Sequence, residues 1–476
     1  MGGSASVAIG RYLLGVIALA VICAALALAA VAIRRRILAD WSGAPARLAE
    51  AVIGLALLIG VLELLGTVGL FALAPVVIGC VLVCWASLRS ASLGPGGPVR
   101  TLPKPGPATV LAILGAATVL AEWGALTIQS YNVGIRGFDS LWYHLPWAAS
   151  YAQTGNVVSL RFTDVEYLTP FYPATAEMLH GLGIVLLGRD TISPGLNLVW
   201  LGLSLFAAYC IGRPRGVGPA TVLGAAVALG TSMMDYSQAG AAANDVVAIF
   251  FLLAAVALYL NGALAVAAVA AGLAVGVKLT VLGPVLALSA GVVAIAPRGR
   301  RRATAVAWLG PLVLAGGFWY LRNLVAVGNP LPWTSLGGLL PTPAAPLQQN
   351  TGFSIAHYLT SAHLWSRFGE PALASGLGRW WWAVLAAAVL GPLLCLLPGR
   401  SGRKGDYLPL SSHAPVRMLG VVALVSLAAY VVTPETAAGP AGDPLGFAFN
   451  LRYLGPALTL ALAVLPLAPP LSRPGA

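Results

Sequence analysis

Asp139 is a candidate catalytic residue. It lies in a short segment rich in aromatic side chains, between Phe138 and Trp142. A carboxylate there can act as a general base on a hydroxyl or an amine, or it can coordinate a divalent cation. His144 follows five residues later, within reach of the same site. Asp139 can instead cap a helix, because Asp before an amphipathic stretch is a common N-cap. The segment alone leaves both interpretations open.

A second acidic site is formed by Asp235, which ends one apolar run, and Asp245, which begins the next. Burying charge near lipid is costly, so two carboxylates that bracket a short link favour a functional role for at least one of them. Helix capping competes again at Asp245, because the apolar stretch begins directly after it.

Three cations stand beside these acids: Lys278, Arg322 and Arg452, each at the end of an apolar run. A lysine can hold a phosphate as a point charge, and arginine can do so through its planar fork. Each one alone can be an anchor that reaches the lipid headgroups. Taken with the acids, the three indicate an anionic headgroup held close to a carboxylate base.

The elements that must position these residues are apolar. Of the 476 residues, 59% are hydrophobic and only 9% charged, and the mean hydropathy is +0.87. Soluble domains carry roughly a quarter charged residues, and runs of about 17–22 apolar residues are long enough to cross a bilayer as helices. The runs lack the two-residue alternation of barrel strands. The sequence therefore predicts an all-α, polytopic helical membrane protein.

About thirteen transmembrane helices are expected, near 9–32, 49–65, 67–87, 108–128, 191–212, 217–234, 245–260, 262–277, 279–296, 303–321, 380–398, 417–432 and 451–469. They divide the chain into a three-span extension (1–105), a membrane module (106–300) and a C-terminal membrane module (301–476). Two long links remain, 129–190 in the first module and 322–379 in the second. Their aromatic side chains predict short juxtamembrane helices.

Basic residues cluster in the short links on one side of the predicted spans: Arg34, Arg35, Arg36, Arg47, Arg89, Arg100, Lys104, Arg213, Arg215, Arg298, Arg300, Arg301, Arg302, Arg400, Arg403 and Lys404. The positive-inside rule makes this face cytoplasmic. The chain is then expected in the cell membrane, with its N-terminus outside, its C-terminus cytoplasmic and both long links extracytoplasmic. The net charge of +12 thus reports topology among membrane lipids rather than a nucleic-acid partner.

Several short motifs follow one another in a set order. They are Phe138-Asp139-Ser140-Leu141-Trp142-Tyr143-His144-Leu145-Pro146, Tyr172-Pro173-Ala174-Thr175-Ala176-Glu177, Asn244-Asp245, Gly276-Val277-Lys278, Trp319-Tyr320-Leu321-Arg322-Asn323 and Arg452-Tyr453. This set, over roughly residues 108–469, resembles the C-type (GT-C superfamily) polytopic membrane glycosyltransferases, and is similar to bacterial protein O-mannosyltransferases and aminoarabinose transferases. The resemblance implies a polyprenyl-phosphate-linked sugar donor and an extracytoplasmic glycan, lipid or protein acceptor.

By the same resemblance, Asp139 and Asp245 are the catalytic acids, and Lys278, Arg322 and Arg452 bind the donor phosphate. Supporting roles fall to His144, Tyr143, Asp235, Glu177 and Tyr453. Two features depart from the family pattern: three additional spans precede the acidic loop, and Asp139 stands without an adjacent acid. The role of the first 105 residues stays open, as does a divalent cation, Mg²⁺ or Mn²⁺, at Asp139.

The expected function is therefore transfer of a sugar from a polyprenyl-phosphate donor, with Asp139 as base or metal-associated carboxylate. The alternative is a transporter or flippase of a lipid-linked glycan. A transporter is expected to carry its ionisable groups near mid-membrane between broken helices, whereas these lie at the ends of apolar runs.

Overall fold

The computed structural model describes residues 2–89, 106–163, 168–335, 337–342, 352–398 and 413–471. Throughout these ranges the secondary structure is helical, apart from an isolated bridge between Phe353 and Ala437. The prediction of an all-α fold is confirmed for this part of the chain.

The N-terminal region folds into three α-helices: α1 (Gly2–Ile37), α2 (Ala44–Thr67) and α3 (Leu73–Arg89). The following region forms α4 (Pro107–Val133), α5 (Leu145–Thr154), α6 (Thr175–Leu187), α7 (Ser193–Gly212), α8 (Gly218–Leu229), α9 (Ser232–Gln238), α10 (Asp245–Leu260), α11 (Leu264–Val277) and α12 (Leu282–Ile295). The last region forms α13 (Arg301–Gly316), α14 (Phe318–Val327), α15 (Ala362–Leu364), α16 (Glu370–Leu377), α17 (Trp381–Cys395), α18 (Ala414–Val432), α19 (Phe447–Asn450) and α20 (Gly455–Val464).

Six of the described helical segments are long and apolar enough to cross a membrane, or eight if each of two bent helix pairs is one span. The remaining apolar helices have 10–17 residues. A helix rises about 1.5 Å per residue, so the twelve residues of α8 cover about 18 Å, well short of a bilayer core. The membrane character of the chain is thus supported, and the count of thirteen spans stays a prediction.

Two predicted boundaries need correction. The expected span 303–321 is broken at Gly317, where α13 and α14 meet at 66°, and α14 continues to Val327, past the predicted start of the second long link. The expected span 217–234 ends at Leu229, and the chain restarts as the short helix α9. Both long links do contain short helices, as predicted, among them α5 in the first and α16 in the second.

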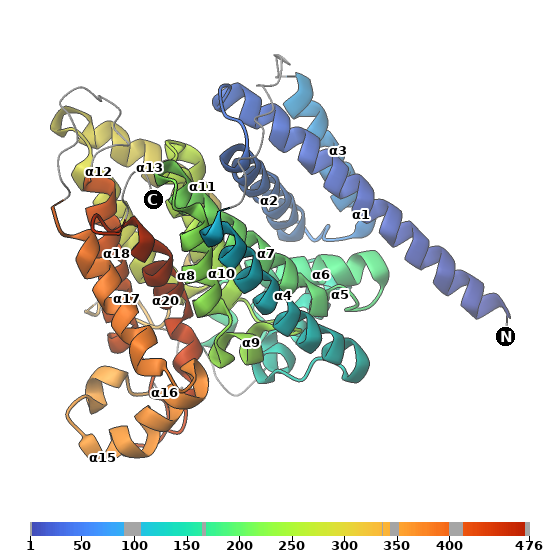
Figure 1. Cartoon of the computed structure of the whole chain (residues 1–476). Helices are drawn as coiled ribbons and strands as arrows, with labels where there is room; N and C mark the ends of the chain where they lie inside the picture. Colours follow the sequence, from blue (N-terminus) through green and yellow to red (C-terminus); the bar gives the residue numbers. More distant parts are fainter. Residues whose placement is uncertain are drawn as a thin grey trace.

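Helix α10 forms the centre of the molecule (Figure 1), packed against α7, α11 and α20. Apart from Tyr259, every residue of this helix is buried, because an unbroken apolar run leaves it no polar face. Close backbone contact stabilises the neighbouring layer: a Cβ at Gly316 of α13 would collide with the carbonyl oxygen of Gly272 of α11. Small residues permit such approach where helices pack in lipid.

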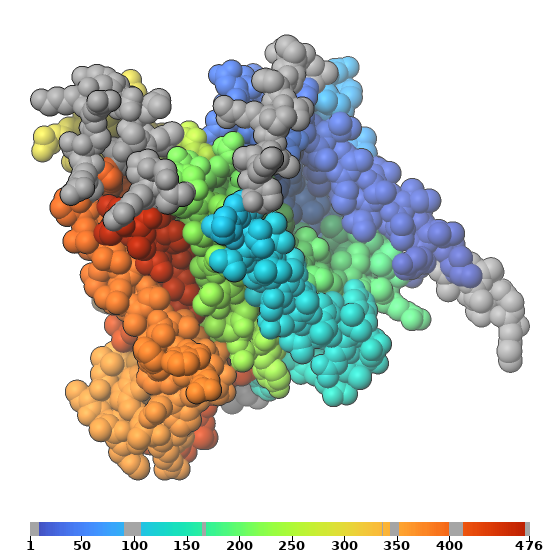
Figure 2. All heavy atoms as spheres, viewed as in Figure 1, coloured from blue at the N-terminus to red at the C-terminus, as the bar shows by residue number. Residues whose placement is uncertain are grey.

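The N-terminal helices lie at one side of the molecule and α15–α18 at the other (Figures 1 and 2). The N-terminal helices contact the central helices: α1 packs against α6, and α2 packs against α10 and α11. Within this group, the buried Glu50 accepts bonds from Arg34, at 3.0 Å, and from Arg47, at 2.5 Å. The bond from Arg34 joins α1 to α2, and the bond from Arg47 lies within α2.

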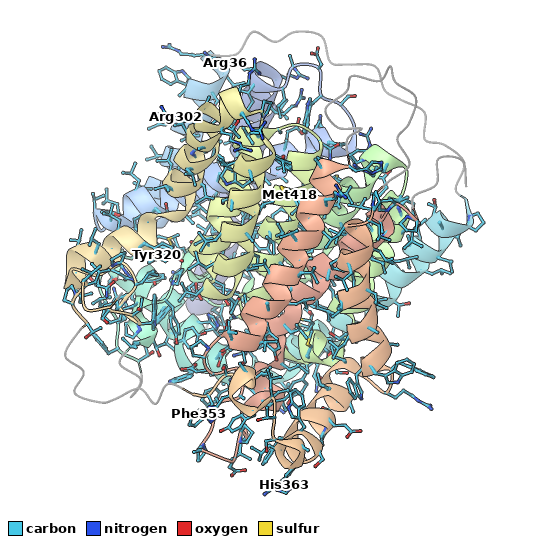
Figure 3. All side chains as sticks on the ribbon, turned by 90° about the vertical axis from the view of Figure 1, so that its left-hand side faces the viewer. Arg36, Arg302, Tyr320, Phe353, His363 and Met418 are labelled. Carbon is cyan, nitrogen blue, oxygen red and sulfur yellow. The ribbon has the colours of Figure 1, made fainter. Side chains whose placement is uncertain are left out.

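Arg36 and Arg302 lie at one end of the molecule, and Phe353 and His363 lie toward the opposite end (Figure 3). Arg36 and Arg302 thus lie at the same end, and the shared cytoplasmic face of all the basic links stays a prediction. The basic residues at 100, 104, 400, 403 and 404 lie outside the described residues. Lys278 precedes α12, whose 14 residues cover about 21 Å before the turn Arg298–Arg300, so Lys278 is far from the end that carries Arg302.

Candidate functional site

Asp139 and Arg452 form a buried ion pair, although 313 residues separate them in the chain. Arg452 Nη2 lies 2.5 Å from Asp139 Oδ2, and the two side chains are 5% and 8% exposed. Asp139 precedes a π-helical turn, Ser140–His144, and its side chain makes no capping bond. The capping interpretation of Asp139 is therefore wrong: the carboxylate points to Arg452.

Arg452 is held in a 3₁₀ turn, Leu451–Leu454, directly before α20. Its guanidinium lies 4.1 Å from the ring centroid of Phe449 and 5.2 Å from that of Tyr453. Cation–π contacts of this kind hold an arginine away from water without neutralising it. The negative charge of Asp139 does neutralise it, so the ion pair has no net charge.

Lys278 and Asp245 form a second buried ion pair, with 2.7 Å between Nζ and Oδ1. The backbone is extended at Lys278, between α11 and the next 3₁₀ turn, and this directs the side chain inward. Asp245 is fully buried and its other oxygen accepts a bond of 2.8 Å from Gln238. Lys278 is thus no headgroup anchor, and Asp245 does not cap α10.

Tyr453 connects the two ion pairs. Lys278 Nζ lies 5.4 Å from its ring centroid, and Arg452 lies against the same ring. Burial lowers the pKa of Lys278 from its ordinary value, an effect that the carboxylate of Asp245 opposes. Burial also raises the pKa of the neighbouring Tyr143, and the charge of Asp139 adds to this rise. Tyr143 therefore stays a neutral phenol beside the pairs.

A histidine–carboxylate pair extends the same network. His144 Nδ1 contacts Glu177 Oε1, and both residues are almost completely buried. Asn244 joins this pair to Lys278: its amide donates to Glu177 Oε1 at 3.3 Å, and its carbonyl oxygen accepts from Lys278 Nζ at 3.0 Å. The Tyr143 ring stacks near His144, with 4.1 Å between centroids. A carboxylate partner of this kind orients an imidazole and fixes its tautomer.

We call this connected set the charged cluster; its members are Asp139, Tyr143, His144, Glu177, Asn244, Asp245, Lys278, Arg452 and Tyr453. It sits where α10 and α20 begin and α11 ends, together with Asp139, Tyr143, His144 and Glu177 of the first long link. Two residues were not predicted for this site: Asn244, a member of the cluster, and Gln238, which donates to Asp245. Asn244 stood beside Asp245 in one of the motifs, but nothing in the sequence indicated that its side chain would join two pairs.

Arg322 is the main correction to the predicted site. Its Nη2 donates to the carbonyl oxygens of Pro170 at 2.8 Å and Tyr172 at 3.4 Å, and its guanidinium also bonds the side chain of Asn323. It is only 8% exposed and lies over the Trp319 ring. Arg322 therefore fastens the turn before α6; it is neither a headgroup anchor nor, among the described residues, paired with an acid of the charged cluster.

Asp235 also falls outside the charged cluster. It lies on α9, half-buried, where burial raises the pKa of its carboxyl and the nearby Glu122 adds to the rise. The charge environment of Asp235 is therefore the α4–α9 contact, and its predicted supporting role has no geometric basis.

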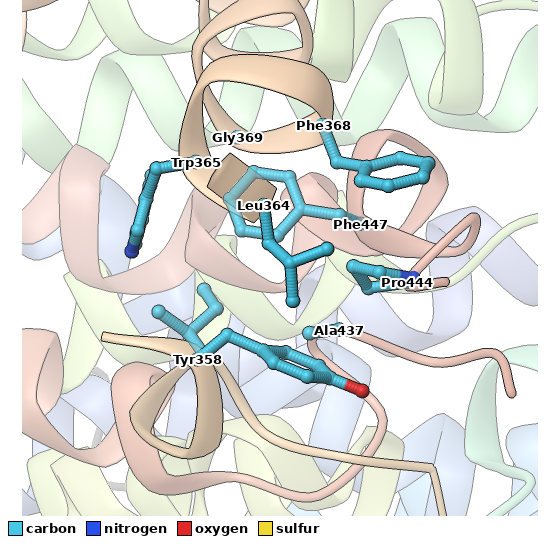
Figure 4. A pocket seen from close by; sticks show the side chains of 9 residues that line it. Tyr358, Leu364, Trp365, Phe368, Gly369, Ala437, Pro444 and Phe447 are labelled. Atoms are coloured by element: carbon cyan, nitrogen blue, oxygen red, sulfur yellow. The ribbon is translucent and has the colours of Figure 1, made fainter. Parts of the chain in front are cut away.

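An apolar pocket lies away from these charges, formed by Ile355, Tyr358, Leu364, Trp365, Phe368, Gly369, Ala437, Pro444 and Phe447. Tyr358 faces Leu364 and Phe447 across it (Figure 4). It offers no charged side chain, so it cannot bind a phosphate. A second hollow, beside Tyr453, is polar and is considered below.

The donor set around Asp139 does not form a ready metal site. In the part of the chain that the structure describes, no three side chains of His, Cys, Asp or Glu come together in a way that could hold an ion. Asp139 and Asp245 each face a cation instead, and Glu177 contacts His144. A divalent cation stays a prediction, and no chemical step below passes through one.

Buried acids and bases in a helical membrane protein are functional candidates, because their burial is costly and needs a compensating role. The arrangement can bind an anion at its two cations and can offer a carboxylate next to that anion. Comparison of the chain with protein-family models, with curated proteins and with solved structures found no match.

Proposed function

We propose that this chain is a membrane glycosyltransferase that moves a sugar from a polyprenyl-phosphate donor to an acceptor on the extracytoplasmic side of the cell membrane. One observation carries the proposal: two buried cations, Lys278 and Arg452, flank one tyrosine ring, and each is paired with a buried carboxylate. A phosphate can bind between the cations while a carboxylate stays beside the bond that breaks.

The chemical step is a displacement at the anomeric carbon. The bond from that carbon to the phosphate oxygen breaks, and its electron pair stays on the departing polyprenyl phosphate. The acceptor oxygen forms the new bond, and its proton passes to the carboxylate of Asp139. Lys278 and Arg452 stabilise the charge that grows on the phosphate, which is the role that positive groups have in a site sheltered from water.

Donor binding would also activate the base. Without a donor, Arg452 holds Asp139 in an ion pair at 2.5 Å, so the carboxylate oxygen that would accept a proton is occupied. The donor phosphate competes for the same guanidinium. As the phosphate binds to Arg452, the bond between Arg452 and Asp139 weakens, and Asp139 can accept the proton of the acceptor.

Asp245 acts through Lys278 in this scheme. It is fully buried and bonded to Gln238, so it keeps the ammonium at one position rather than meeting the substrate. Glu177 does the same for His144, and Asn244 connects both arrangements. These are positioning residues for the reaction.

A transporter or flippase of a lipid-linked glycan is the second candidate. Two described helix pairs are sharply bent, by 66° at α13–α14 and by 83° at α16–α17. Broken helices are common in transporters, where they line a substrate path. The charged cluster lies at helix ends and not at those breaks, and for this reason we favour the transferase.

The test compares purified wild type, Asp139→Asn and the matched control Asp190→Asn in liposomes with labelled polyprenyl-phosphate sugars and membrane extract as the acceptor source. Asp190 is an exposed aspartate outside the charged cluster. A general base contributes about 10²–10⁴-fold, so Asp139→Asn should lower transfer by that factor while the control keeps it. Undiminished transfer by Asp139→Asn would remove this residue from the mechanism. Donor movement between leaflets without transfer would favour the transporter.

A further inference from the structure

A small hollow lies next to the charged cluster, where α12 and α20 begin and α18 ends. Its lining residues are Thr280, Pro284, Ser426, Tyr430, Thr433, Tyr453, Pro456 and Ala457. Five of these carry hydroxyl groups and none is charged. We call it the hydroxyl hollow. Its cavity volume is about 10 Å³, which is room for one water-sized group.

Two of its hydroxyl groups are buried without a partner. Tyr430 is 8% exposed, and neither its hydroxyl nor Thr280 Oγ1 has a hydrogen-bond partner in the described structure. The other two small hydroxyls are satisfied locally: Ser426 donates to Val422 O at 2.6 Å and Thr433 donates to Ala429 O at 2.7 Å. Buried polar groups are nearly always paired, so the two orphans point to a group that arrives from outside.

The hollow shares a wall with the charged cluster. Tyr453 lines the hollow, and Lys278 and Arg452 lie against the ring of the same residue. Thr280 follows Lys278 by two residues. A ligand with a phosphate at the two cations therefore reaches the hollow with whatever group is attached directly to that phosphate.

We propose that the hydroxyl hollow binds one neutral hydroxyl group of the donor's sugar, through Tyr430 and Thr280. This inference rests on the proposed function, because it assumes that the donor phosphate lies at Lys278 and Arg452. The hollow thereby selects sugars that carry a hydroxyl at one ring position. An ammonium or a carboxylate at that position would be desolvated among uncharged side chains, so sugars that carry the charged group there are poor donors.

The test combines Tyr430→Phe with a series of donors, each lacking one sugar hydroxyl. The wild type should use the analogue that lacks the recognised hydroxyl about 3- to 10-fold less well in kcat/KM, the usual effect of one neutral hydrogen bond. In Tyr430→Phe the preference at that ring position should shrink, because only Thr280 remains to bind the hydroxyl, and the preferences at other positions should stay. Thr280→Val should act at the same position.

Two controls keep the outcome clear. Tyr259→Phe removes a tyrosine hydroxyl from the far end of α10 and should leave every preference intact. Tyr430→Phe deletes an unpartnered hydroxyl, so its melting temperature should not fall below that of the wild type.

Each failure has its own signature. If the wild type transfers sugar and Tyr430→Phe treats every analogue as the wild type does, the hollow holds only an ordered water and this inference is wrong while the proposed function stands. If Tyr430→Phe changes the preference among modified acceptors but not among donor analogues, the hollow binds the acceptor and the proposal is wrong. If no donor supports transfer by the wild type, the proposed function fails and the inference fails with it.

Discussion

The ion pair between Lys278 and Asp245 can be broken from one side by Lys278→Met. Methionine has a similar length and no charge, so the substitution removes the ammonium and leaves the shape of the side chain nearly intact. Asp245, which is fully buried, then keeps the bond from Gln238 but loses the positive charge at 2.7 Å. An unpaired carboxylate remains in the interior.

The magnitude follows from that burial. Removing one partner of a buried ion pair costs about 3–5 kcal/mol, because the remaining charge has neither water nor a counter-charge. The unfolding entropy of proteins is about 2.1 cal/mol/K per residue, so a chain of 476 residues loses about 1 °C per kcal/mol. Lys278→Met should therefore lower the melting temperature by about 3–5 °C.

The assay is thermal unfolding in detergent of wild type, Lys278→Met and the double variant Lys278→Met/Asp245→Asn. The double variant has no buried charge at the pair, and the asparagine carbonyl can still accept from Gln238, so most of the lost stability should return. Sugar transfer should not return, because the phosphate has lost one cation. A single variant as stable as the wild type, or a double variant less stable than the single one, would refute the reasoning.

The remaining predictions concern pH and Arg322. Because burial lowers the pKa of Lys278 below its ordinary value near 10.5, transfer should fall as pH rises through the lowered pKa, and Lys278→Arg should move this limb to higher pH. Stability should change in the opposite sense: between the two pKa values the folded chain binds fewer protons than the unfolded chain, so melting temperature should rise with pH there. Arg322→Ala should lower the free energy of unfolding by about 2–3 kcal/mol through loss of bonds to Pro170 and Tyr172, yet change the Kd for polyprenyl phosphate less than about threefold. Melting curves and donor titrations check this; a large loss of affinity with unchanged melting would return Arg322 to the binding site.

The sequence predicts that Lys278, Arg322 and Arg452 lie close to Asp139; in the structure Lys278 and Arg452 lie in the charged cluster with Asp139, and Arg322 does not. The reasons were physical: Lys278 and Arg452 lie at the ends of apolar runs, Asp139 lies in the long link that follows another run, and alternation of the runs places all three on one side. Charged side chains that are buried at one side of a helical bundle pair with one another, because an unpaired buried charge is costly.

Arg322 shows where the same reasoning fails. It stands at the end of an apolar run after a Trp-Tyr pair and looks equivalent in sequence to Arg452. The difference comes from the bend at Gly317, which turns α14 by 66° and presents Arg322 to the carbonyl oxygens of Pro170 and Tyr172 in the first long link. Neither the angle of that bend nor the position of these carbonyl oxygens can be derived from residue types.

The capping interpretations of Asp139 and Asp245 failed for a related reason. A helix cap depends on the direction of one side chain. A carboxylate at the start of a helix can accept hydrogen bonds from backbone amides or form an ion pair with a nearby cation. Here the cations come from distant parts of the chain, Arg452 for one and Lys278 for the other. Local patterns carry no information on such partners.

The hairpin of α10 and α11 has a consequence for assembly. Its two open ends carry Asp245 and Lys278, which meet because antiparallel helices joined by the short turn at Asn261 and Gly262 bring their free ends together. This hairpin can enter a bilayer with its charges already cancelled. The pair of Asp139 and Arg452 cannot close so early, since Arg452 is synthesised 313 residues later. Asp139 therefore has no counter-ion until the ribosome has released the start of α20, and the site is completed only after that helix has been synthesised.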